Sequence, residues 1–115
     1  MIRRELIAKI IYEFTADEGF LAELRARNFS PRKFEDIILT LQKYKELIQG
    51  EEFIERSVAY AVFNLFFELL GAVKYYPQNE QERSMIENAL EQFLPLAHEI
   101  LAPEWMTGPL PDEYK

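Results

Sequence analysis

The segment from residue 53 to residue 73, FIERSVAYAVFNLFFELLGAV, constrains the fold more than any other part of the chain. Beyond Arg56 it is apolar around nearly its whole circumference, with Asn64 and Glu68 as its only strongly polar side chains. A helix that is apolar on every face must be surrounded by protein or by lipid. We therefore expect this segment to be the central and most buried helix of a helical bundle, and to help form a subunit interface.

The other apolar residues recur at helical spacing, which predicts further helices on both sides of this segment. We expect a first helix over residues 2–14 and a short second helix over residues 17–27. Ser30 and Pro31 are typical of a helix start, and this third helix should run to about residue 49, where Gly50 ends it. The central helix should then cover residues 51–76, with Gly71 as the place for a bend or a close helix crossing. The last helix should begin after Asn79, and Pro95 should kink it or start a second helix.

These elements predict an all-α fold, an antiparallel four-helix bundle with an additional short N-terminal helix and an extended C-terminal tail. The bundle should form one domain over residues 1–102. Residues 103–115 are rich in proline and should form a tail that packs on the bundle or on a partner. Trp105, at the start of this tail, is a candidate contact residue because tryptophan is enriched at interfaces.

Composition excludes several classes of site. Cysteine is absent, which rules out disulfides, thiolate zinc sites, iron–sulfur clusters and cysteine nucleophiles, and suits a reducing cytoplasm. The net charge of −7 disfavours binding to nucleic acid. No phosphate-binding glycine loop and no secretory signal pattern are recognisable. We therefore expect a cytoplasmic protein with no cofactor, no nucleic-acid partner and no membrane span.

Four acids carry the one resemblance to a catalytic pattern. Glu51, Glu52, Glu55 and Glu68 match in type and order the E-E-x-x-E…E-x-x-D arrangement, which they resemble over about a fifth of the chain. This arrangement belongs to the all-α nucleotide pyrophosphohydrolases of the MazG type. The resemblance implies Mg²⁺ held by these carboxylates against a nucleoside triphosphate, but Gly71 stands where the final aspartate belongs.

Two single residues are also candidates for chemistry. Glu68 is either a buried acid with a raised pKa, a member of a narrow solvent-exposed strip with Asn64, or the partner of an arginine such as Arg25 or Arg56. His98 is the only histidine, and it lacks the acid three residues before it that a di-iron site needs. We expect His98 to be a partly exposed helix residue.

The leading prediction is a protein–protein interaction or regulatory module without catalysis. It should form a homodimer and bind a further protein, because one small bundle can hardly cover every face of its central helix. The candidate pocket or interface residues are Tyr60, Phe63, Asn64, Phe67, Glu68 and Trp105. The alternatives are the Mg²⁺-dependent nucleotide hydrolase and a small-ligand pocket between helices, lined by Tyr60, Phe63, Phe66 and Phe67.

Overall fold

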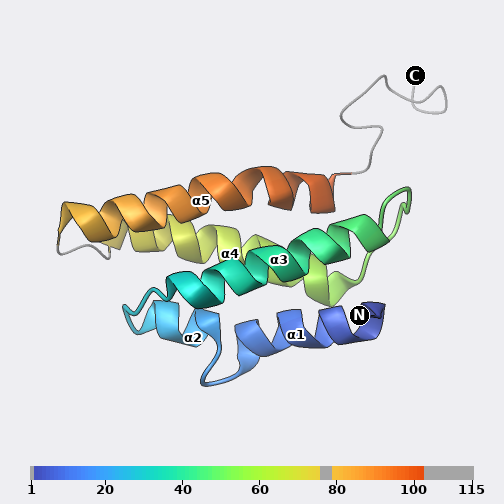
Figure 1. Cartoon of the computed structure of the whole chain (residues 1–115), viewed down its shortest axis with the longest axis horizontal. Helices are drawn as coiled ribbons and strands as arrows, with labels where there is room; N and C mark the ends of the chain where they lie inside the picture. The colour runs from blue at the N-terminus through green and yellow to red at the C-terminus, as the bar shows by residue number, and fades with distance from the viewer. Residues whose placement is uncertain (1, 76–78, 103–115) are drawn as a thin grey trace.

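The computed structural model describes residues 2–75 and 79–102, and within these ranges the protein is all-α without a strand. The helices are α1 (Arg3–Thr15), α2 (Phe20–Arg25), α3 (Pro31–Leu47), α4 (Arg56–Tyr75) and α5 (Glu80–Leu101) (Figure 1). The prediction of an all-α protein is confirmed.

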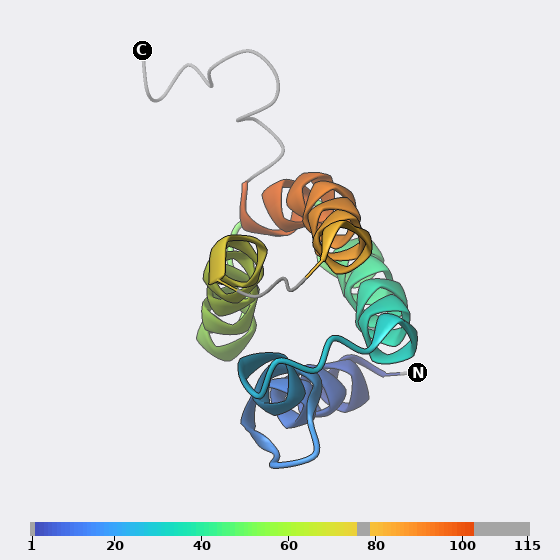
Figure 2. The same cartoon turned by 90° about the vertical axis from the view of Figure 1, so that its left-hand side faces the viewer.

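The helices surround one apolar core. Figure 1 shows α3, α4 and α5 along the long axis of the molecule, with the chain reversing direction from each to the next and α1 and α2 on the remaining side. In the end-on view, α4 lies between α5 and the α1–α2 pair, across from α3 (Figure 2). The contacts agree, since α4 touches α5, α1 and α2, while α3 packs against α1 and α5. No other described helix covers the outward side of α4.

The start of α3 follows the sequence pattern closely. The Ser30 hydroxyl accepts a hydrogen bond from the Lys33 backbone N–H at 3.3 Å, and Pro31 is the first helical residue. Phe29 and Phe34, on either side of this cap, pack with their ring centroids 5.8 Å apart, and Phe20 of α2 contacts both rings. The three rings join α2 to α3, so the predicted cap also fixes the position of the short helix.

Helix α2 is shorter than residues 17–27, and the chain around Gly19 explains why. A Cβ atom at Gly19 would lie 2.7 Å from the Glu13 carbonyl oxygen and 2.8 Å from that of Tyr12. The chain therefore folds back tightly over the end of α1 before α2 begins at Phe20. The helix ends at Arg25 because Arg27 adopts a φ of 62°, the left-handed conformation that commonly terminates helices.

The prediction that the central helix starts at residue 51 is wrong, because α4 begins at Arg56. Gly50, with a φ of 82°, turns the chain after α3 as expected, but residues 51–55 form a non-helical connection. The carbonyl of Glu55 accepts the first backbone hydrogen bonds of α4, from Val58 and Ala59. Acidic side chains after a glycine thus belong to a connection here rather than to a first helical turn.

Helix α5 follows its predicted cap, and of the two effects predicted for Pro95 the start of a second helix is wrong. The Asn79 side chain accepts from the Glu82 N–H at 2.8 Å, and one helix then runs through Pro95 to Leu101. Pro95 lies on the exposed side, where water can hydrate the carbonyl that loses its donor. Phe93, Leu96 and Ala97 keep the same face of the helix in the core, so no second helix starts.

Candidate interaction surface

Helix α4 has a buried inner face and an exposed outer face. Val58, Val62, Leu65 and Leu69 are fully buried in the core. The outward side carries apolar side chains that are 45–67% exposed, and we call these residues the α4 outer face: Tyr60, Phe63, Phe67 and Leu70. The prediction that this helix is the most buried and is enclosed on all sides is therefore wrong for a single chain. Among the described helices, α4 packs mainly against α5, α1 and α2, which leaves its outward side exposed.

The α4 outer face forms one continuous stripe. Its residues are separated by three, four and three positions, which is the spacing of the contact seam in a coiled coil. Phe63 and Phe67 are already in edge-to-face contact, with ring centroids 4.9 Å apart, and Phe66 meets Phe67 at 5.4 Å. These contacts restrict the rings before any partner binds, which lowers the entropy cost of binding.

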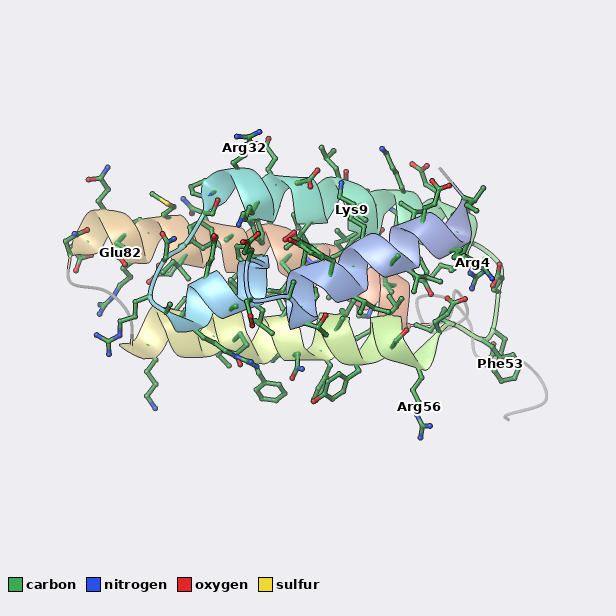
Figure 3. The ribbon with its side chains drawn as sticks, turned by 90° about the horizontal axis from the view of Figure 1, so that it is seen from below. Arg4, Lys9, Arg32, Phe53, Arg56 and Glu82 are labelled. Atoms are coloured by element: carbon green, nitrogen blue, oxygen red, sulfur yellow. The ribbon has the colours of Figure 1, made fainter. Side chains whose placement is uncertain are left out.

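The N-terminal end of α4 adds a further apolar side chain. Phe53 in the preceding connection is 84% exposed, and it lies at the same end of the molecule as Arg56 (Figure 3). Both side chains project away from the bundle in this view. Phe53 therefore extends the apolar surface beyond the end of the helix.

Glu68 is engaged in an ion pair across the bundle. Its carboxylate accepts hydrogen bonds from the Arg25 guanidinium at 2.9 Å, and its side chain is 30% exposed. Of the three predictions for Glu68, the arginine partner on α2 is thus confirmed. The pair joins α2 to α4 on the flank of the α4 outer face, with Asn64 partly exposed one turn earlier. The Glu68 carboxylate is therefore already paired with Arg25, and this ion pair holds α2 against α4.

The connection before α4 is held by a cluster of charged and polar groups. The Arg3 guanidinium donates to Glu55 at 2.8 and 3.0 Å, and to both oxygens of Glu51 at 2.8 Å. The hydroxyl of the buried Tyr44 donates to the same Glu55 carboxylate. Arg3 lowers the pKa of Glu55, while burial and the bond to Glu55 raise the pKa of Tyr44 to about 12. The cluster ties α1, α3 and the connection together, so residues 51–55 are fixed without being helical.

The structure does not bring the four acids of the pyrophosphohydrolase-like pattern together. Glu51 and Glu55 bind Arg3 near the start of α4, whereas Glu68 binds Arg25 thirteen positions later, about 20 Å along the helix. Glu52 is exposed in the connection. Across residues 2–75 and 79–102, no group of three or more His, Asp or Glu side chains is placed to hold a metal ion. Three of the four acids, Glu51, Glu55 and Glu68, therefore serve as ion-pair partners of two different arginines.

Two surface hollows lie away from the α4 outer face. One, of about 370 Å³, lies where the connection after α3 meets the end of α5, and Ile48, Ile54 and Ile100 contribute to its lining. The other, of about 780 Å³, opens between α1 and α3 beside Tyr12, Lys33 and Asp36. Neither is lined by the residues proposed for a small-ligand pocket, Tyr60, Phe63, Phe66 and Phe67. Tyr60, Phe63 and Phe67 are instead exposed on the surface, and Phe66 is partly exposed beside them.

The remaining predictions concern His98, Trp105 with the C-terminal tail, and a membrane span. His98 lies exposed in the last turn of α5, as expected. Trp105 and the rest of the predicted tail, residues 103–115, lie outside the described residues. Helix α4 is long and apolar enough by length and composition to cross a membrane, over Arg56–Lys74. Its inner face, however, is already packed against α5, α1 and α2, as the core helix of a bundle would be.

Sequence reasoning identified Tyr60, Phe63 and Phe67 but missed several residues that matter. Leu70 completes the stripe, and its place three positions after Phe67, in the repeating three-four pattern, was a usable signal. Phe53 was assigned to the helix and not to the surface. The Arg3–Glu55–Tyr44 cluster joins residues far apart in the chain, and no local pattern indicates it.

Comparison of the chain with protein-family models, with curated proteins and with solved structures gave no match. The function therefore has to be argued from the surface itself.

Proposed function

We propose that this protein works as an interaction module that binds another protein through the α4 outer face and carries out no catalysis. The observation that supports this most directly is the exposed stripe of Tyr60, Phe63, Phe67 and Leu70 at coiled-coil spacing. Its scaffold is an antiparallel four-helix bundle with one short additional helix. A protein partner of matching chemistry presents an apolar helix face or an equivalent apolar ridge.

The exposed apolar area is large enough to act as a binding surface. From the exposed fractions, the four side chains contribute roughly 400 Å², given that an aromatic side chain can bury about 200 Å². This is within the range of the largest apolar patch on a typical monomer, and such patches are often functional. Covering it would yield roughly 10 kcal/mol of hydrophobic free energy before the entropy cost of association is subtracted.

Charge favours a protein partner over nucleic acid. The molecule carries a net charge of −7, and the only acid between residues 57 and 73 is Glu68, whose carboxylate is paired with Arg25. The α4 outer face is therefore a neutral, apolar region on an otherwise acidic molecule, which suits an apolar contact and offers nothing to phosphate groups. A cytoplasmic setting fits the absence of cysteine.

Site-specific photo-crosslinking in cells that produce the protein tests this proposal. A photoreactive phenylalanine analogue replaces Phe63 in one variant and Phe67 in another. Leu39 on α3, which is 52% exposed, carries the analogue in the matched control. We expect covalent adducts with a polypeptide at both α4 positions and none at the control position.

The position and the mass of the adducts decide whether the proposal holds. Any discrete polypeptide adduct confined to the α4 positions supports the interaction module, whatever its identity. Absence of adducts at both α4 positions, or equal labelling at Leu39, overturns it. Adducts with lipid alone also overturn it, because they would assign the apolar stripe to a membrane surface.

A further inference from the structure

We infer that the partner on the α4 outer face is a second copy of this chain, with the two α4 helices paired antiparallel about a two-fold axis close to Leu65. This inference rests on the proposed function and specifies its partner. A two-fold dimer uses the same patch on both subunits, so the patch must be complementary to itself. The stripe on α4 meets this requirement when it is read in either direction.

The side chains of the stripe form a near-palindrome. From either end, the order is a large side chain and then a phenylalanine next to the centre: Tyr60 and Phe63, then Phe67 and Leu70. Reversing one copy therefore places Phe63 opposite the partner's Phe67 and Tyr60 opposite the partner's Leu70. Each contact layer then combines side chains of similar total volume, as close packing requires. A parallel pairing would instead stack tyrosine on tyrosine at one end and leucine on leucine at the other.

The residues beside the stripe fit the same arrangement. Ser57, Asn64 and Gly71 recur every seven positions along one edge. In the antiparallel pairing, Asn64 meets its own counterpart at the axis, where two side-chain amides can exchange hydrogen bonds. Ser57 faces the partner's Gly71, and a Cβ added at Gly71 meets nothing within 4 Å in the single chain. Small residues at both ends of this edge let a second helix approach closely.

Area and charge are adequate for a dimer of moderate affinity. A stable interface buries about 800 Å² on each partner. The four outer side chains supply about half of this, and Ala59, Phe66 and Val73 along the opposite edge add partly exposed apolar surface. The two copies are both strongly acidic, and the neutral α4 outer face is a surface on which they can meet with little repulsion. We expect a dissociation constant in the micromolar range.

The absence of cysteine makes the pairing direction directly measurable. Three single-cysteine variants of the full chain, Ser57→Cys, Asn64→Cys and Gly71→Cys, are treated with a short bismaleimide at micromolar concentration. In the antiparallel dimer, Asn64→Cys crosslinks to itself, whereas Ser57→Cys and Gly71→Cys do so only when they are mixed. A cysteine at Leu39 on α3 serves as the control and should not crosslink. Light scattering across a concentration series gives the mass of each sample before crosslinking.

A matched double variant tests whether the stripe carries the affinity. Phe63→Ser with Phe67→Ser should raise the dissociation constant at least about 100-fold, since both side chains lie at the centre of the pairing. Leu39→Ser with Leu94→Ser removes two side chains of comparable exposure from α3 and α5 and should leave it unchanged. Circular dichroism confirms that both double variants remain helical.

Each other outcome contradicts the inference in a recognisable way. Self-crosslinking of all three cysteine variants would show a parallel pair. A monomer at every concentration, with a heterologous adduct in the photo-crosslinking experiment, would keep the interaction module and remove the second copy. A monomer that binds vesicles of neutral phospholipid through the stripe would assign it to a membrane surface and remove both proposals.

Discussion

Glu55 is the residue on which the connection before α4 depends. It accepts hydrogen bonds from the Arg3 guanidinium and from the buried Tyr44 hydroxyl, and its carbonyl begins the helix. Replacing Glu55 with Gln removes the charge and weakens both side-chain bonds. We expect a loss of about 1–2 kcal/mol in the free energy of unfolding, because the Tyr44 hydroxyl is left with a poorer acceptor. Chemical denaturation measures the loss, and Glu52→Gln, in the same connection, is the control.

The pH dependence of this loss has a definite sign. Arg3 lowers the pKa of Glu55 in the folded protein below its ordinary value of 4.5. The carboxylate therefore stabilises the fold above about pH 4.5, and this contribution disappears as the pH falls through the folded value. The difference between wild type and Glu55→Gln should be full at pH 7 and vanish under acid conditions. A difference that stays constant down to low pH would contradict the assignment.

Glu13 behaves in the opposite way. Its side chain is buried at the end of α1 and accepts the Phe20 backbone N–H at 3.3 Å, at the start of α2. Burial raises its pKa above 4.5, so the charged form is disfavoured in the folded state, and stability is lost as the pH rises through the folded value. Glu13→Gln keeps an acceptor without the charge. We expect it to be at least as stable as wild type at pH 7 and to lose this advantage below pH 4.5.

The variant Glu13→Leu is the control for Glu13→Gln. Glu13→Leu also removes the charge but cannot accept from Phe20, and should lose about 1–3 kcal/mol through the unsatisfied N–H. Equal stability of the glutamine and leucine variants would show that the hydrogen bond is unimportant and that only the charge matters.

At the scale of the helices, a close approach of two chain segments was expected at Gly71, but within the single chain it occurs at Gly19. The close approach of two chain segments is at Gly19, where a Cβ would collide with the carbonyl oxygens of Tyr12 and Glu13. Gly71 lies in open space on an uninterrupted helix. We expect Gly19→Ala to cost about 1–3 kcal/mol, and Gly71→Ala to stabilise α4 by up to about 1 kcal/mol. Thermal denaturation at concentrations below dimer formation compares the two, and destabilisation by Gly71→Ala would contradict the open surroundings.

Much of the helical organisation could be predicted because its signals are local. Ser30–Pro31, Asn79 and the apolar spacing of α1 act within one or two turns, and the structure follows them. The start of α4 could not be predicted, because it depends on Arg3, which lies about 50 positions earlier in the chain. The all-round apolar character of α4 was read correctly, and one small bundle was not expected to cover every face of it, but α4 was wrongly expected to be the most buried helix. Composition shows that an apolar helix face is to be buried, but it does not show whether the same chain or a partner buries it.

For the whole molecule, the balance between charge and apolar surface predicts how self-association responds to salt. Two copies with a net charge of −7 each repel one another, while the contact proposed between them through α4 is apolar. Raising the ionic strength from about 10 mM to about 150 mM shortens the screening length from about 30 Å to about 8 Å. The dimer should therefore become several-fold tighter, as measured by sedimentation velocity. Weaker association at the higher ionic strength would instead indicate an interface built on ion pairs.

The bond between Arg3 and Glu55 joins positions 52 residues apart, and this separation matters while the protein is being made. Helix α1 is synthesised long before Glu55, the residue that Arg3 binds. Until α3 and the connection to α4 have emerged, Leu6 and Ile10 have no core to enter and remain open to water or to a chaperone. These apolar side chains therefore stay exposed while the chain up to residue 55 is made, and slowing translation before residue 55 should lower the yield.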